Sequence, residues 1–65
     1  MINIKTLDKF VGQEITMTTY YNYVYTGSKL EKLADNKFRV ANVDFEPSDV
    51  IKSRAASTLE IEINF

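Results

Sequence analysis

The stretch from Glu14 to Val43 constrains the fold of this chain most, because apolar and polar residues alternate along it over long segments. Such alternation is typical of β-strands that bury one face. The segment Tyr23–Leu33 is too long for one flat strand, and Gly27 in its middle predicts a sharp bend or a bulge. We therefore expect two or three long, strongly twisted strands in this stretch.

The residues on either side of that segment predict two further strands and two turns. Glu14–Tyr20 alternates like a strand with one solvated face, and Tyr21-Asn22 favours a tight reversal because asparagine tolerates left-handed backbone. Ala34-Asp35-Asn36 supplies the next turn. Lys37–Val43 carries apolar residues on both faces, which indicates one strand that is buried on two sides.

The N-terminal residues predict a short helix, Thr6–Val11, that covers one opening of the strands. Thr6 is the expected N-cap, and Gly12 is well placed to end the helix in the left-handed region. The apolar face of this helix is expected to consist of Leu7, Phe10 and Val11.

The last third of the chain predicts a turn and one clear strand. Asp44–Asp49 is expected to be a turn segment, because Pro47 bars a central strand there. Val50–Ser57 is ambiguous, because Val50 and Ile51 look like a strand whereas Ala55-Ala56 would suit a helix equally well. Thr58–Phe65 alternates cleanly and predicts a half-buried strand. Its apolar face is expected to consist of Leu59, Ile61, Ile63 and Phe65.

Size and composition bound the function. With 65 residues the chain is expected to form one domain, residues 1–65. This length is near the lower limit for a domain that folds without disulfides, a bound metal or oligomerisation. It has no cysteine and no histidine, which excludes disulfides and thiol or imidazole chemistry.

The net charge of the chain is −1, which argues against a protein that coats nucleic acid without regard to sequence. It is compatible with a local patch of basic residues. No apolar run approaches the ~18 residues of a membrane span, so we expect a cytoplasmic protein with no membrane partner.

No catalytic or metal-binding pattern stands out, so we expect a protein that is not an enzyme and holds no metal or cofactor. Glu60 and Glu62 project from one face of a predicted strand, as the paired carboxylates of glycosidases do. A chain of this size can hardly build the enclosing cleft that such a reaction needs.

Four short segments form a further pattern in chain order. Leu7–Met17 contains a helix that ends in glycine and a first strand, and Tyr25–Leu30 is a bent second strand. Asp35–Val40 is an acidic turn with a third strand, and Val50–Ser53 has the sequence Val-Ile-Lys-Ser. Together they resemble the Sm-like family of SH3-type small barrels. The resemblance implies an all-β fold (small α+β at most) in which a short N-terminal helix precedes a five-stranded, strongly bent barrel. The chain departs from that pattern at Asn22-Tyr23, where the family usually has a glycine, and in its RNA-binding loops.

Members of that family bind RNA and form rings in which a fourth strand pairs with the fifth strand of a neighbour. The resemblance therefore implies a homo-oligomer that binds RNA or another nucleotide-containing ligand. The pairing strand in this chain is expected to be Thr58–Phe65, since unpaired strand edges attract partners. The expected interface residues are Leu59, Ile61 and Ile63.

A cluster of tyrosines is the best candidate for an interaction surface. Tyr21, Tyr23 and Tyr25 lie close together with Tyr20, and tyrosine rings stack on bases or fill protein pockets. Tyr23 and Tyr25 share one face of their strand, so they form an outward pair if Val24 points inward. Ordinary packing between neighbouring strands is the alternative.

Basic residues give a second candidate surface. Lys37 and Arg39 follow the acidic turn, and Lys52 and Arg54 are expected nearby in space. Such a group of cations suits phosphates. A solvated face is the alternative, because acidic residues dilute the positive charge.

Two functions follow from these surfaces. The first is a small, oligomeric, non-enzymatic Sm-like protein that binds RNA or a nucleotide-containing ligand. The alternative is a small protein-binding inhibitor or adaptor, of the kind that phages and other mobile elements encode. Such a protein would act on a host protein through its aromatic face or an edge strand.

Overall fold

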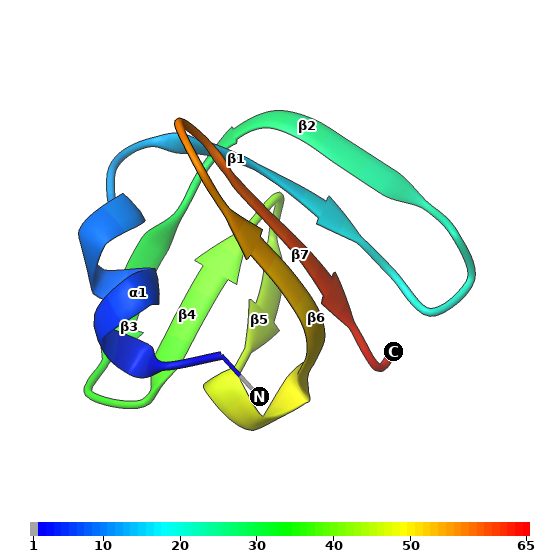
Figure 1. Ribbon diagram of the computed structural model, residues 1–65. Helices are drawn as coiled ribbons and strands as arrows, with labels where there is room; N and C mark the ends of the chain where they lie inside the picture. The colour runs from blue at the N-terminus through cyan, green and yellow to red at the C-terminus, as the bar shows by residue number, and fades with distance from the viewer. Residues whose placement is uncertain (1) are drawn as a thin grey trace.

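The computed structural model describes residues 2–65, which form one α-helix, seven β-strands and one 3-10 turn. In chain order these elements are α1 (Ile4–Phe10), β1 (Glu14–Thr18), β2 (Val24–Lys29), β3 (Glu31–Ala34), β4 (Lys37–Val40), β5 (Val43–Phe45), η1 (Pro47–Asp49), β6 (Val50–Ala55) and β7 (Leu59–Ile63). The strands form two sheets (Figure 1), one in the order β2-β1-β7-β6 and the other in the order β3-β4-β5. Strands β1 and β7 pair in parallel, and the other paired strands are antiparallel.

The two sheets enclose one apolar core, and the expected β-rich fold with a short helix is confirmed. The buried core residues are Ile2, Leu7, Phe10, Ile15, Met17, Leu30, Phe38, Val40, Phe45, Val50, Leu59, Ile61 and Ile63. The sheets do not close into a barrel, and seven strands replace the expected five. One reason is Leu30, a fully buried residue at which the chain leaves β2 in the first sheet and enters β3 in the second.

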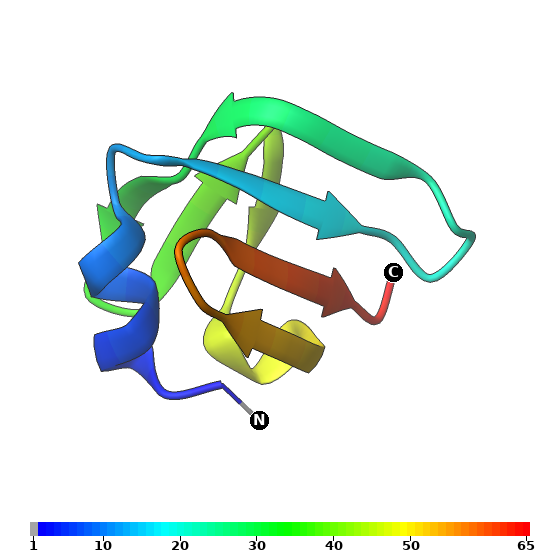
Figure 2. The same ribbon diagram turned by 45° about the horizontal axis from the view of Figure 1, so that its top comes forward.

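Gly27 produces the predicted bulge. One residue of β1, Thr16, faces two residues of β2, Thr26 and Gly27. Gly27 has a φ of +76°, a left-handed conformation that glycine adopts without strain from a side chain. The bulge bends β2 over the core, and the β1–β2 hairpin then projects beyond the neighbouring strands (Figure 2).

The single strand expected over Lys37–Val43 is wrong. Val40 pairs with Val43, so β4 and β5 form a hairpin whose two-residue turn is Ala41-Asn42. Both turn residues have positive φ, 51° and 63°, as a type I′ turn requires. The sequence did not reveal this turn, because it lacks the usual Asn-Gly pair. The apolar residues Val40 and Val43 on either side of it also make the segment look like one continuous strand.

Helix α1 begins two residues earlier than expected. The side chain of Asn3 accepts a hydrogen bond from the Lys5 N–H at 2.9 Å, so Asn3 rather than Thr6 is the N-cap. Leu7 and Phe10 are buried as predicted, whereas Val11 is exposed because the helix ends before it. No helix among residues 2–65 is long and apolar enough to cross a membrane.

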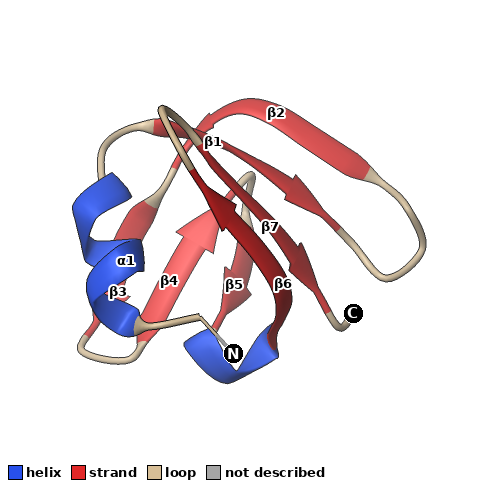
Figure 3. Cartoon of the chain, in the orientation of Figure 1, coloured by secondary structure: helices blue, strands red, loops and turns tan. Residues whose placement is uncertain are grey.

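The ambiguous segment after the acidic turn forms a strand. Pro47 opens the 3-10 turn η1, where its fixed φ suits the first helical position, and β6 follows at once (Figure 3). Ala55 ends β6, so neither it nor the segment before it becomes helical. Val50–Ala55 forms a strand because it pairs with β7. The intrinsic preference of these residues for strand or helix is too weak to determine the conformation by itself.

The residues expected to form an oligomer interface lie in the core instead. Leu59, Ile61 and Ile63 are at most 3% exposed. Strand β7 pairs with β1 on one side and with β6 on the other, so it has no free edge for a neighbouring copy. Association through this strand does not fit the fold, because the alternation marks the central strand of a sheet and not its edge.

Candidate functional site

The tyrosine cluster is built on the turn that joins β1 to β2. The Thr19 N–H donates to the Tyr23 carbonyl at 2.8 Å, and the Asn22 N–H donates to the Thr19 carbonyl at 3.0 Å. Asn22 has a φ of 66°, so the loop is a three-residue hairpin turn that ends in the left-handed region. The predicted reversal at this position is confirmed. The Thr19 hydroxyl also accepts the Tyr23 N–H at 3.1 Å, which fixes the base of the turn.

We define the tyrosine hairpin as Tyr20, Tyr21, Tyr23 and Tyr25. All four side chains are exposed, from 37% for Tyr25 to 74% for Tyr21. The rings of Tyr20 and Tyr21 meet edge to face, with centroids 5.5 Å apart. Such a cluster of large exposed rings at the tip of a projecting hairpin is uncommon on a monomeric protein and marks interaction sites.

The condition for an outward pair of Tyr23 and Tyr25, that Val24 points inward, is not met. Val24 pairs with Thr18, whose side chain lies on the solvent face of the sheet, and Val24 is 59% exposed. Tyr25 pairs with Met17 on the core-facing side. Val24 therefore points outward, and Tyr25 stays accessible because the hairpin projects beyond the core.

Two exposed aromatic residues of this region were missing from the predicted site. Tyr20 was not among the predicted binding residues, and Phe65 was expected on the buried face of the last strand. The Tyr20 N–H donates to the Phe65 carbonyl at 3.1 Å, so Phe65 lies beside the turn. Its side chain is exposed because β7 ends at Ile63, two residues earlier. The alternation of apolar and polar residues continues to Phe65, so the sequence did not indicate that the strand ends at Ile63.

Lys37 and Arg39 lie on the outer face of the three-stranded sheet, since they alternate with buried residues of β4. Arg39 makes two hydrogen bonds to Asp44 on β5, Nε to Oδ1 at 2.6 Å and Nη2 to Oδ2 at 3.3 Å. Its other cross-strand neighbour is Glu31. The hydrogen bond from Arg39 lowers the pKa of the Asp44 carboxyl and raises the pKa of the guanidinium. Arg39 is therefore already occupied by a carboxylate.

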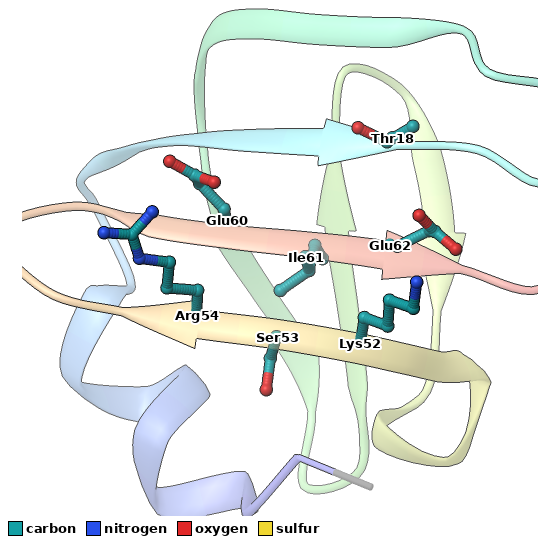
Figure 4. A pocket seen from close by; sticks show the side chains of 7 residues that line it. All are labelled: Thr18, Lys52, Ser53, Arg54, Glu60, Ile61 and Glu62. Atoms are coloured by element: carbon teal, nitrogen blue, oxygen red, sulfur yellow. The ribbon is translucent and has the colours of Figure 1, made fainter.

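Lys52 and Arg54 lie on the outer face of the other sheet, so the four basic residues do not form one patch. Across the β6–β7 ladder Lys52 faces Glu62, and Arg54 faces Glu60. Figure 4 shows these four side chains around an open hollow of about 300 Å³ that also involves Thr18 of β1. The two basic pairs are separated because the sheets pack with their apolar faces together, which turns their polar faces apart.

Among residues 2–65, no group of three or more aspartate, glutamate, histidine or cysteine side chains is placed to hold a metal ion. The Lys32 ammonium forms an ion pair with Asp8 of α1 at 2.8 Å and lies 5.6 Å from the centre of the Phe38 ring. This contact fastens the helix to β3.

Comparison of the chain with protein-family models, with curated proteins and with solved structures finds no match.

Proposed function

We propose that this chain is a small, non-enzymatic module that binds another protein through the tyrosine hairpin. The observation that carries the proposal is the exposure of four tyrosine rings on one projecting turn. Tyrosine offers a large apolar contact surface and a hydroxyl while losing little side-chain entropy, and it is enriched among the residues that dominate binding energy. Phe65 beside the turn extends the aromatic surface.

The distribution of charge supports a protein partner over RNA. Residues that bind single-stranded nucleic acid combine stacking rings with cations that hold the backbone. The segment Thr18–Thr26 contains no lysine or arginine. Arg39 is hydrogen-bonded to Asp44, and Lys52 and Arg54 each face a glutamate across the ladder. Binding of RNA or a nucleotide-containing ligand is therefore the second candidate, and its support is the sequence resemblance described above.

The proposed partner is a host protein, which the module inhibits or links to another component in the cytoplasm, as small proteins of phages and other mobile elements do. Rings at the centre of such an interface become fully desolvated, and truncation of one anchor costs about 2 kcal/mol or more of binding free energy. Added salt then has little effect, because the anchors carry no charge.

The experiment is an affinity capture from host lysate with the tagged chain and two double variants. Tyr21→Ala/Tyr23→Ala removes two rings of the hairpin, and Lys37→Ala/Arg39→Ala is the matched control on the opposite sheet. We expect a partner that the wild type and the lysine–arginine control retain, that the tyrosine variant loses, and that survives nuclease and raised salt. Its affinity is then measured with the purified proteins.

A direct titration with labelled, mixed-sequence single-stranded RNA at low ionic strength tests the second candidate. Phosphate contacts are strongest under that condition. RNA binding that the lysine–arginine variant weakens, together with nuclease-sensitive capture, would overturn the protein-binding proposal in favour of RNA.

A further inference from the structure

Strand β6 is one edge of the larger sheet, and the tyrosine hairpin lies on the opposite edge, β2. An edge strand presents unpaired backbone groups with which another extended chain can pair. The other edges are poorer templates, because β3 and β5 have only four and three residues and the Gly27 bulge interrupts β2 in its middle. The irregularity of β6 lies at its start, between Val50 and Lys52, so the stretch from Lys52 to Ala55 is regular.

The hydrogen bonds at the end of β7 show in which direction its backbone groups point. The Phe65 carbonyl accepts from the Tyr20 N–H at 3.1 Å, on the side of β1. The Asn64 N–H donates to the Asp49 carbonyl at 3.0 Å, on the side of β6. Backbone groups of successive residues in a strand alternate in direction. The even-numbered residues of β7 therefore bond to β6, and the odd-numbered ones bond to β1.

The same alternation identifies the free backbone groups of β6. Lys52 and Arg54 pair with the two glutamates of β7, so their backbone groups are used within the sheet. Ser53 lies between them, so its N–H and C=O are directed toward the free edge. Ser53 and Ala55 are exposed although the residues opposite them on β7 are buried. Within residues 2–65, this margin of the sheet is therefore open.

The side chains along this edge are basic on the outer face of the sheet. Lys52 and Arg54 extend over that face beside the two glutamates of β7 (Figure 4), and neither cation forms an ion pair among residues 2–65. Both can bond to carboxylates on a strand added outside β6. The charges would then alternate from strand to strand, with glutamate on β7, a cation on β6 and a carboxylate on the added strand, and opposite charges on neighbouring strands attract.

We propose that the free edge of β6 binds an extended segment of another protein as an added antiparallel strand, with carboxylates at two alternate positions opposite Lys52 and Arg54. The residue between these carboxylates exchanges backbone hydrogen bonds with Ser53. Alternate side chains of a strand lie on one face, so both carboxylates reach the cations. A second copy of β6 does not fit this edge, because it would oppose cations with cations. This inference goes beyond the proposed function, since it places a second binding surface on the edge opposite to the tyrosine hairpin.

Synthetic peptides test the spacing of the carboxylates. The probe is fluorescein-labelled Glu-Val-Glu-Val-Glu, and the control Glu-Glu-Val-Val-Glu has the same composition and charge but no two glutamates at alternate positions. In fluorescence anisotropy at low ionic strength, we expect the alternating peptide to bind about five times more tightly, because one further ion pair forms. Lys-Val-Lys-Val-Lys should not bind. Tyr21→Ala/Tyr23→Ala should bind the alternating peptide as the wild type does, which separates this surface from the tyrosine hairpin.

Variants of β6 test the contact from the side of the protein. Lys52→Glu/Arg54→Glu should lose the glutamate peptide and bind the lysine peptide instead. Ser53→Pro removes an N–H that points to the free edge and leaves the hydrogen bonds to β7 in place, as proline in an edge strand can. It should abolish binding, whereas Ser53→Ala keeps the N–H and should bind like the wild type. Circular dichroism and urea unfolding show whether each variant is folded.

Amide hydrogen exchange of the unchanged protein reports on the same contact without any substitution. In the free protein the Ser53 N–H should exchange faster than those of Lys52 and Arg54, and a saturating concentration of the alternating peptide should slow the exchange at Ser53. Equal affinity for the two acidic peptides, or no binding of the alternating one, would overturn the proposal. So would a folded Ser53→Pro variant that binds normally, or exchange at Ser53 that the bound peptide does not slow.

Discussion

Tyr25 lies directly opposite Met17 in the β1–β2 ladder, so the two side chains share the face of the sheet that is directed toward the core. Met17 is fully buried, whereas Tyr25 is 37% exposed. The difference arises because β2 is the edge strand and its hairpin extends past the second sheet. The boundary between the hydrophobic core and the tyrosine hairpin therefore runs between these two residues.

The first prediction separates binding from stability. Tyr21→Ala should change the free energy of unfolding by no more than about 0.5 kcal/mol, because a surface ring outside the core contributes little to folding. Phe38→Ala should cost about 3–5 kcal/mol, since Phe38 is fully buried and stacks on Phe45 with centroids 6.1 Å apart. Urea unfolding of the two variants measures both values. A Tyr21 variant as unstable as the Phe38 variant would mean that the hairpin belongs to the core.

The second prediction concerns the bulge in β2. Gly27→Ala should destabilise the fold by about 1–2 kcal/mol, the penalty of left-handed backbone for an L-residue. A Cβ built at this position meets no atom within 4 Å, so the loss comes from the backbone conformation and not from a clash. Gly27→Asn is the matched control, and it should recover part of the loss because asparagine tolerates this region. Equal losses for alanine and asparagine would contradict the backbone explanation.

The third prediction concerns the turn between β4 and β5. Ala41 adopts a φ of 51°, which is unfavourable for alanine. Ala41→Gly should therefore stabilise the protein by roughly 0.5–1 kcal/mol, even though glycine also makes the unfolded chain more flexible. Thermal unfolding measures the change. Ala55→Gly, in the regular strand β6, is the control and should destabilise the protein, so a loss at both positions would argue against the positive-φ turn.

The fourth prediction concerns pH. The hydrogen bond from Arg39 lowers the pKa of Asp44 in the folded state, so this contact stabilises the fold above the ordinary aspartate pKa and is lost as the pH falls through the lowered value. Asp44→Asn should thus be less stable than the wild type at neutral pH, and the difference should shrink below about pH 4. Raised salt should also reduce it, because both groups are exposed. Urea unfolding across the acidic range measures the difference, and a constant gap would show that the ion pair does not contribute.

The local elements of this fold follow from the sequence where neighbouring residues decide the conformation. The alternation in Glu14–Tyr20 and Thr58–Phe65 predicts strands because one face of each must be apolar. It identifies every buried apolar residue of β1 and β7 correctly and fails only at Phe65, which is exposed beyond the end of β7. Gly27 and Asn22 indicate a bulge and a turn because few other residues adopt positive φ easily. These features depend on side-chain sequence and backbone sterics alone.

Only the tertiary structure decides which strands become neighbours and which faces remain open. The alternation of Leu59, Ile61 and Ile63 is the same for an edge strand and a central strand, and only pairing with β1 and β6 places them in the core. Lys37 and Lys52 belong to different sheets, so the predicted basic patch is divided between opposite faces. Val24 and Tyr25 alternate along the chain, but the direction of each was fixed by the register against Thr18 and Met17. A shift of one residue would exchange their faces, and the sequence by itself leaves that register undetermined.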